Sequence, residues 1–271
     1  MNYLDYIIIA VYLLGFLGIG YFFKENKNSS DYFLGGRSIG WFPLSLSTMA
    51  TQLSAISFIS APAFVGLKEG GGLQWLTYEL AVPLAMAFLL VMIIPTLYKS
   101  GIISVYEFLE KRFDASSRLL IAFVFQISRS VATGVMVYTM ALILQATTGI
   151  EFWISVILIG IITMIYSFQG GMKAVIWGDV IQMCILFFGI VICLGYGLSE
   201  LGGVSNFLTE VDSDRLVAID FTKWGFNNAD GNDEFGFWPM IIGGFFLYAS
   251  YYGTDQTQSQ RLLSSKDIPT I

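Results

Sequence analysis

Apolar runs long enough to cross a membrane recur along the whole chain, and they constrain its fold more than any other feature. A helix needs about 20 largely apolar residues to span the hydrocarbon core. Seven such runs can be marked, at 6–23, 41–65, 76–97, 119–147, 152–168, 174–198 and 237–262. A spanning β-barrel would instead show alternating segments of about 10 residues. The sequence therefore predicts an all-α, polytopic membrane protein.

The composition supports a membrane protein without enzymatic chemistry. Of 271 residues, 55% are hydrophobic and 13% are charged, whereas soluble domains carry about 25% charged residues. The sequence has no histidine, which argues against zinc–histidine hydrolases and imidazole proton relays. It also lacks a GxSxG elbow and a paired-aspartate metal motif. We expect no catalytic residues and no cofactor.

The basic residues predict an orientation in the membrane. They concentrate after the first, third, fifth and seventh runs, and cytoplasmic loops are the ones enriched in lysine and arginine. These residues are Lys24, Lys27, Arg37, Lys99, Lys111, Arg112, Arg118, Lys173, Arg261 and Lys266, whereas the opposite loops hold only Lys68, Arg215 and Lys223. The N-terminus is predicted outside and the end of this chain inside the cell membrane. The acidic loop 199–236 is then extracytoplasmic and partly helical. Its aspartates form either a vestibule that attracts cations or a solvated surface.

The run at 41–65 is a poor membrane helix because small polar side chains interrupt it. Ala50, Leu53, Ser54 and Ser57 are spaced i, i+3, i+4 and i+7, and they share one face if the helix continues. Such a face offers hydroxyls, and main-chain carbonyls where the helix unwinds, which suits a dehydrated sodium ion. The alternative is that these residues are packing contacts between helices. The polar residues are Ser45, Ser47, Thr48, Thr51, Gln52, Ser54, Ser57 and Ser60.

The run at 237–262 is also irregular. It carries Gly243, Gly244 and Gly253 and then continues into polar residues around Asp255. Irregular backbone at membrane depth occurs only where protein or a water-filled cavity satisfies its polar groups. A pair of interrupted helices is the best sequence pointer to a transporter's binding site. The two irregular runs therefore predict a transporter site between them.

Charged side chains inside the runs are costly, at about 2.5–3.5 kcal/mol each on insertion scales. Two alternatives are open for Arg129 and Glu79. Either they pair with each other, or Arg129 binds a substrate carboxylate through two parallel hydrogen bonds and Glu79 accepts hydrogen bonds from substrate hydroxyls. Asp179 and Gln182 share a face near the inner end of their run. The Asp179 carboxylate is a cation ligand there, or an end residue that reaches toward water.

Four blocks of the sequence, in order, resemble the sodium:solute symporter family. They are "DYFLGGRSIGWF" at 31–42, "VYEFLEKRFD" at 105–114, "YSFQGGMKAVIWGDVIQ" at 166–182 and "YYGTDQTQSQRLLSSKD" at 251–267. The third block resembles the most diagnostic signature of the family. Its paired glycines also predict a tight inner-face turn between two spans.

The resemblance implies a leucine-transporter-like fold, which has an extra first helix and two inverted five-helix repeats. In that fold the first helix of each repeat is broken, and these would be the two irregular runs. Residues 38–198 would form the first repeat, 199–236 an extracytoplasmic loop and 237–271 the start of the second repeat. The family is roughly twice this length, so we expect a truncated sequence that lacks the helix with the hydroxyl ligands of the sodium site.

The resemblance also implies roles for individual residues. Ala50 and Leu53 match carbonyl donors of the shared sodium site, and Asp179 matches a carboxylate on the intracellular sodium path. The remaining matches concern the solute. Ser54, Ser57 and Glu79 match pocket positions, Gln52 and Tyr251 match gate positions, and Arg129 matches a carboxylate-binding arginine of sialic acid transporters.

Two departures bear on the solute. In the galactose symporters that this chain resembles, a pocket asparagine matches Tyr248 and a pocket serine matches Val82. These changes argue against a plain hexose pocket. We expect sodium-coupled symport of a small sugar-like or carboxylated solute, such as a sialic acid. The expected partners are sodium, the solute and the bilayer, and no nucleic acid. The alternative is a transporter-like sensor that binds solute without moving it.

Overall fold

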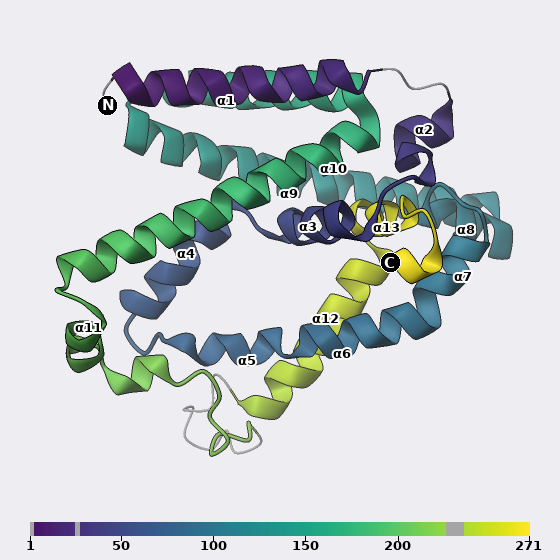
Figure 1. Ribbon diagram of the computed structural model, residues 1–271. Helices are drawn as coiled ribbons and strands as arrows, with labels where there is room; N and C mark the ends of the chain where they lie inside the picture. The colour runs from purple at the N-terminus through teal and green to yellow at the C-terminus, as the bar shows by residue number, and fades with distance from the viewer. Residues whose placement is uncertain (1–2, 25–27, 226–235) are drawn as a thin grey trace. The chain divides into compact units, whose positions relative to one another are not determined.

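The computed structural model of this chain describes residues 3–24, 28–225 and 236–271, apart from the side chains of residues 55 and 56. Helices make up nearly all of these ranges (Figure 1). Within them β-structure is limited to one isolated parallel bridge between Ile39 and Ser265. The predicted cytoplasmic Lys27 and the part of the acidic loop at 226–235 lie outside the described residues.

In chain order the helical elements are α1 (Tyr3–Phe22), α2 (Ser29–Leu34), η1 (Gly35–Arg37), α3 (Trp41–Gln52), α4 (Ala55–Gly66), η2 (Leu73–Trp75), α5 (Leu76–Glu79), α6 (Ala81–Phe88), η3 (Leu89–Ile93), α7 (Ile94–Lys99), α8 (Val105–Arg112), α9 (Ala115–Thr148), α10 (Phe152–Glu200), α11 (Val204–Glu210), η4 (Ser213–Leu216), α12 (Phe237–Thr254), α13 (Gln256–Leu263) and η6 (Ile268–Thr270). Of these, η3 is π-helical, and the other η elements are 3₁₀ helices.

The apolar runs correspond to helices of spanning length. Among the described residues, four helical stretches are long and apolar enough to cross a membrane, at Tyr3–Phe22, Leu73–Lys99, Ala115–Thr148 and Phe152–Glu200. A fifth counts Trp41–Gln52 and Ser57–Gly66 as one broken span. Two predicted spans share α10, and the predicted seventh span is divided between α12 and α13. The prediction of a polytopic α-helical protein is confirmed.

The chain divides into two compact units. The first contains segments from 1–56, 97–182 and 259–271, and the second contains 57–96 and 183–258. In the first unit a small core of Ile39, Leu44, Met172 and Ile176 joins the start of α3 to the middle of α10. The backbone N–H of Ile39 donates to the Ser264 carbonyl (3.3 Å), and the N–H of Lys266 donates to the Ile39 carbonyl (3.2 Å). These bonds connect the segment before α3 to the segment after α13.

A sharp bend divides α10 within the first unit, and Figure 1 shows the change of direction. Gly171 has φ 58° and ψ −153°, a combination that is essentially restricted to glycine. A Cβ at this position would lie 2.7 Å from the carbonyl oxygen of Tyr32. The Tyr32 hydroxyl in turn donates to the Phe168 carbonyl at 3.2 Å. The turn predicted from the paired glycines is confirmed.

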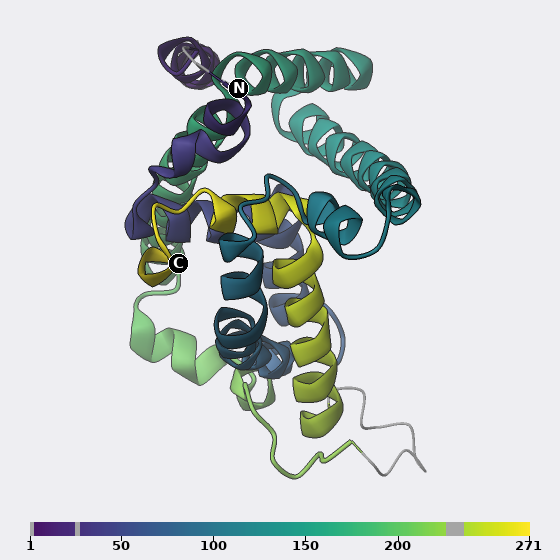
Figure 2. The ribbon, with the colours of Figure 1, turned by 90° about the vertical axis from the view of Figure 1, so that its right-hand side faces the viewer.

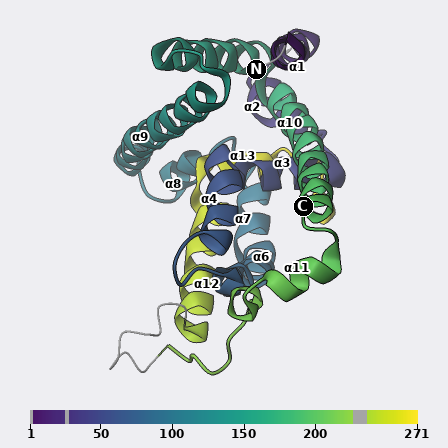
Figure 3. The ribbon, with the colours of Figure 1, turned by 90° about the vertical axis from the view of Figure 1, so that its left-hand side faces the viewer.

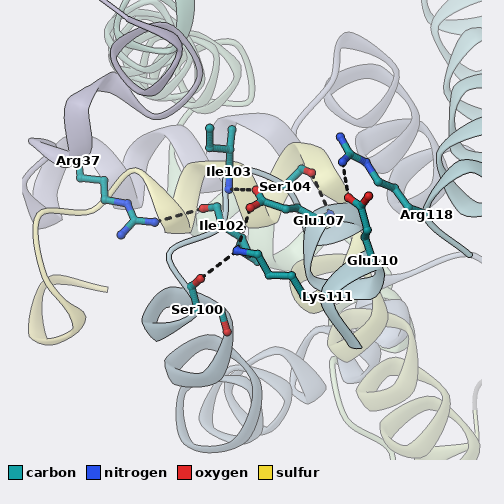
Figure 4. Close-up of polar contacts among 9 residues, drawn as sticks. All are labelled: Arg37, Ser100, Ile102, Ile103, Ser104, Glu107, Glu110, Lys111 and Arg118. Atoms are coloured by element: carbon teal, nitrogen blue, oxygen red, sulfur yellow. Dashed lines mark hydrogen bonds and ion pairs between the residues drawn. The ribbon is translucent and has the colours of Figure 1, made fainter. Parts of the chain in front are cut away.

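The short helix α8 lies beside the start of α9 in the first unit, as Figures 2 and 3 both show. Ser104 caps it, because its hydroxyl accepts from the backbone N–H of Glu107 (3.3 Å). The Glu107 carboxylate reaches back to the N–H of Ile103 (3.0 Å) and pairs with Lys111 (2.9 Å) (Figure 4). The Ile103 N–H, and then Lys111, hold the pKa of Glu107 below its ordinary value.

Two arginines fix the neighbourhood of α8. The Arg37 guanidinium donates to the Ile102 carbonyl at 3.1 Å, and Arg118 forms an ion pair with Glu110 (Figure 4). The sequence placed α8 in a loop between two apolar runs, so this helix is an addition to the predicted fold. Its capping pattern, S-x-x-E at 104–107, was the available signal.

The second unit is built around α12. This helix packs against α5 and α6 (Figure 1), with Phe88 and Phe245 in edge contact at 5.6 Å between ring centroids. Residues 204–216 of the predicted extracytoplasmic loop form α11 and η4, so the expectation of a partly helical loop is confirmed for its described part. The division into repeats at 38–198 and 237–271 stays a prediction.

Candidate functional site

Asp179 forms the centre of a buried polar cluster in the first unit. Its Oδ2 atom accepts from the Ser47 hydroxyl (2.6 Å) and from Arg261 Nη2 (3.0 Å) and Nε (3.3 Å). Arg261 Nε also donates to the Ser47 hydroxyl oxygen at 3.0 Å. The three side chains therefore close a ring, contributed by α3, α10 and α13. This ring is the Ser47–Asp179–Arg261 cluster.

Burial makes this cluster energetically important. Ser47 is fully buried, and the side chains of Arg261 and Asp179 are 10% and 13% exposed. Removing one partner of a buried ion pair costs about 3–5 kcal/mol, because the other charge is left without compensation. The alternative in which Asp179 reaches toward water at the end of its span is therefore wrong. All of these bonds go to Oδ2, and Oδ1 of Asp179 takes part in none of them.

The span at 41–65 is broken, as the sequence predicted. α3 ends at Gln52, Leu53 is extended (φ −81°, ψ 132°) and α4 begins at Ala55. A helix end leaves up to four carbonyl groups without intrahelical partners, and the carbonyls of Ala50 and Leu53 belong to this end. The break therefore places Ala50 and Leu53 at a helix end, and their role as sodium ligands stays a prediction.

The break also corrects one detail of the sequence-based prediction. Ala50, Leu53, Ser54 and Ser57 were expected on one helical face. Ala50 lies in α3, Leu53 and Ser54 lie in the interruption, and Ser57 lies in α4. The i, i+3, i+4, i+7 relation holds only in an unbroken helix, so these residues do not share a helical face.

The hydroxyl groups of α3 differ in what they bond. The hydroxyls of Ser45 and Thr51 donate to carbonyls four residues earlier, at 2.8 and 2.7 Å, which is the local bonding typical of serine and threonine in helices. Ser47 instead reaches Asp179. Thr48 Oγ1 is buried without a hydrogen-bond partner among the described residues. Ser45 and Thr51 therefore bond within their own helix, whereas Ser47 bonds across to α10 and α13, which is a contact between helices of the kind that the packing alternative describes.

The seventh span is interrupted at its polar end. α12 runs without a break through Gly243, Gly244 and Gly253, and the interruption falls at Asp255, which is extended (φ −68°, ψ 125°). The Asp255 carboxylate then caps α13 by accepting from the backbone N–H of Thr257 at 2.8 Å. An aspartate before a helix is a favoured N-cap residue. Asp255, rather than the glycines, marks the position of the break.

Glu79 has a partner that the sequence did not indicate. The Glu79 carboxylate and the Tyr248 hydroxyl are joined by a side-chain hydrogen bond within the second unit. Tyr248 is 4% exposed, and its ring lies against Tyr78 (5.4 Å) and stacks on Tyr252 (6.1 Å). Tyr248 therefore holds Glu79 through a hydroxyl and is itself fixed by two aromatic rings.

The remaining predicted site residues lie as follows. Arg129 is half-buried on α9, with its guanidinium 5.4 Å from the Phe125 ring centroid. Tyr251, near the end of α12, is half-buried and in edge contact with Tyr252. Gln52 is half-buried at the end of α3. The pairing of Arg129 with Glu79 stays a prediction, because the two residues belong to different units.

The order of these features along the chain matches a known family. The model of the family described as "SSF: Sodium:solute symporter family" matches residues 32–271. The chain belongs to the sodium:solute symporter family.

Individual family members agree with this assignment. Sodium-coupled monocarboxylate transporter 2 of Mus musculus is 33% identical over 97% of this chain and 42% of its own length. The sodium/iodide cotransporter of Homo sapiens is 32% identical over 97% of this chain and 40% of its own length. The chain thus spans about two fifths of the length of the curated relatives that it matches.

The fold agrees as well. The solved structure of a Na⁺-coupled sialic acid symporter, in a substrate-bound outward-open state, is 28% identical, with a TM-score of 0.87. The match covers 99% of this chain and 55% of that one. The leucine-transporter-like fold implied by the resemblance is confirmed for the part of it that this symporter-family chain contains.

Sequence reasoning missed two members of the buried cluster. In the sequence, Arg261 stood out only as a predicted cytoplasmic charge, and Ser47 only as one of several hydroxyls in a polar run. The signal that pointed to Arg261 was Asp179 itself, because a buried carboxylate needs a cationic or hydrogen-bonding partner. Lys173 and Arg261 both lie on the predicted inner side, and sequence alone does not choose between them.

Proposed function

We propose that the complete protein carrying this sequence is a sodium-coupled symporter for a small organic solute. The observation that carries the proposal is the break at Leu53–Ser54 in a chain of the sodium:solute symporter family. Freed main-chain oxygens are suitable ligands for an alkali cation, and half-helix ends near a membrane's midplane bind ions and substrates in many transporters. Family membership and geometry support the same activity, and we propose a transporter rather than an enzyme.

The proposed sodium ligands are the carbonyls of Ala50 and Leu53 and the carboxylate of Asp179. Asp179 already has Arg261 as a counter-ion, so a sodium ion there binds Oδ1 or replaces the arginine. Sodium enters as a transported ion and not as a resident cofactor, and we propose no other cofactor. An inward-negative potential adds about 2.3 kcal/mol per charge for each 100 mV, which is enough to drive accumulation.

We propose that the solute carries a carboxylate. The relatives are named for monocarboxylates and iodide, and the structural match is a sialic acid symporter. Arg129 is the residue suited to a carboxylate, through its planar fork of donors. We further propose that Ser54, Ser57 and Glu79 contact the solute, and that Gln52 and Tyr251 gate its path.

The proposed setting is the cell membrane. The chain is a multi-pass membrane protein of this family, and the distribution of lysine and arginine predicts its N-terminus outside and Ile271 on the cytoplasmic side. The partners are sodium, the solute and the surrounding lipid, and we propose no role for nucleic acid.

The proposal is tested by reconstituting the complete protein into proteoliposomes. Uptake of radiolabelled L-lactate, N-acetylneuraminic acid, D-galactose and iodide is compared with an inward sodium gradient and with potassium in its place. We expect uptake of at least one carboxylate only with sodium. Solute binding without uptake would support the sensor alternative, and absence of both would refute the proposed function.

A further inference from the structure

The side chain of Arg215 is bonded to the C-terminal end of α4 in the second unit. Its Nη1 atom donates to the carbonyls of Val65 (2.7 Å), Lys68 (3.2 Å) and Gly71 (3.4 Å). Val65 lies in the last turn of α4, and the other two follow in the turn after it. We call this set of contacts the Arg215 latch.

Helix chemistry explains why a cation is stabilising at this position. The last carbonyls of a helix lack intrahelical partners and carry partial negative charge. The backbone N–H groups of Leu67 and Lys68 both donate to the Ala63 carbonyl (2.8 and 3.1 Å), which leaves later carbonyls to be satisfied from outside the helix. A guanidinium is always charged and offers five donors in a rigid plane. Arg215 therefore caps α4 from a segment 150 residues further along the chain.

Two other contacts hold the segment 215–218 in place. A Cβ at Gly72 would lie 3.0 Å from Cα of Arg215, so the two backbones approach more closely than a side chain at Gly72 would allow. The Thr77 hydroxyl, 3% exposed, donates to the Ala218 carbonyl at 2.8 Å. Residues 215–218 are thus bonded to both the end of α4 and the start of α5. This part of the acidic loop is not simply a solvated face.

Resting on the proposed function, we infer that Arg215 is a positioning residue for transport. α4 is the half of the broken span that carries Ser57, a proposed solute contact, and the latch fixes its far end. When the latch is intact, α4 is held in the arrangement that binds solute. When it is broken, part of the binding free energy is used to order α4 before the solute is held.

Kinetics of the complete protein in proteoliposomes test this inference. Arg215→Met keeps the length of the side chain but removes its charge and donors, and Arg215→Lys restores a charge and three donors. We expect KM for the best-transported solute of the panel to rise about tenfold in Arg215→Met, which corresponds to about 1.4 kcal/mol. We expect kcat to change less than about twofold, because the lost term is ground-state binding, and Arg215→Lys to recover part of the affinity.

Lys223→Met is the matched control. Lys223 lies in the same loop and pairs with Asp220 at 3.7 Å, so its removal tests the effect of one lost loop charge. We expect its KM to match that of the unmodified protein. An unchanged KM in Arg215→Met, or an equal rise in Lys223→Met, would overturn the inference.

Hydrogen exchange supplies a readout that does not depend on transport. We expect the amides of 66–72 and 212–218 to exchange faster in Arg215→Met than in Arg215→Lys, because local opening sets their protection. Exchange in Arg215→Met equal to that in the unmodified protein would show that the latch does not restrain α4. Absence of sodium-dependent uptake by the unmodified protein refutes the proposed function, whereas normal uptake with an unchanged KM in Arg215→Met refutes this inference alone.

Discussion

At the scale of single residues, the Ser47–Asp179–Arg261 cluster shows how a buried charge is accommodated. Asp179 was predictable as important from its place in an apolar run, because charges there are costly. Its partner was not predictable, because Arg261 is 82 positions away along the chain and apolar periodicity carries no information about pairing. The same limit applies to Tyr248, which the sequence identified as unusual without indicating its bond to Glu79.

The first prediction concerns the coupling between Asp179 and Arg261. Asp179→Asn and Arg261→Gln each leave one buried charge without its partner, so we expect each to lower the free energy of unfolding by about 3–5 kcal/mol. The double variant removes both charges and is expected to cost less than the sum. Denaturant unfolding of the complete detergent-solubilised protein measures the three changes.

Lys111→Gln is the control for this cycle. It breaks the exposed pair with Glu107, whose two side chains are 54% and 28% exposed, and surface pairs contribute about 0–1 kcal/mol. Additive costs in the double variant, or a cost as small as that of Lys111→Gln, would contradict a coupled pair.

At the scale of elements, apolar run length predicted the spans well because a bilayer fixes the length of a helix. The short helices α2 and α8 were missed, since they lie outside the apolar runs and depend on local caps. Asn28 and Ser104, for example, cap α2 and α8 through their side chains. The shared face expected in the span at 41–65 failed because periodicity assumes the continuity that the break removes.

The second prediction concerns the bend in α10. Gly171→Ala places a Cβ 2.7 Å from the Tyr32 carbonyl oxygen in a glycine-restricted conformation, and we expect it to lower stability by about 1–3 kcal/mol. Gly160→Ala, in the same helix, is the control because a Cβ there meets nothing within 4 Å. Alanine is the better helix former by about 1 kcal/mol, so the control is neutral or stabilising. Thermal unfolding that ranks the two variants equally would contradict the role of the bend.

The third prediction is a pH dependence at the start of α8. The pKa of Glu107 is below its ordinary value of 4.5, so its contribution to stability is fully present above that value and is lost as pH falls through the folded-state pKa. Glu107→Gln retains a hydrogen-bonding amide but removes the charge. We expect it to be less stable than the unmodified protein at neutral pH, with the difference shrinking below about pH 4.5. Melting temperatures across an acid series measure this, and a constant difference would contradict it.

At the scale of the whole molecule, the proposed activity rests on similarity to relatives that are longer than this chain. The chain covers 42% of the length of a monocarboxylate transporter relative, and alternating access in this class of folds involves two repeats. Sequence established the class of fold because four separated blocks resembled one family. The identity of the solute could not be predicted in the same way, because solute specificity depends on a few side chains rather than on the pattern of spans.

The fourth prediction tests the choice of solute. Arg129→Ala in the complete protein is expected to abolish sodium-dependent uptake of carboxylates, because a bidentate donor is lost, and to leave uptake of neutral solutes unaffected. Phe125→Leu, which removes only the ring under the guanidinium, is the control and should change uptake modestly. Equal loss for charged and neutral solutes would assign Arg129 a structural role.

The bridge between Ile39 and Ser265 has a mechanical consequence. It joins the segment before α3 to the segment after α13 through main-chain atoms alone. Under the proposed function, we expect α3 and α13 to move together when the inner side opens. Side-chain substitutions at those two positions leave these main-chain bonds intact. A proline at Lys266 would remove one of the two N–H donors, and the bond from Ile39 to Ser264 and the Ser47–Asp179–Arg261 cluster would remain.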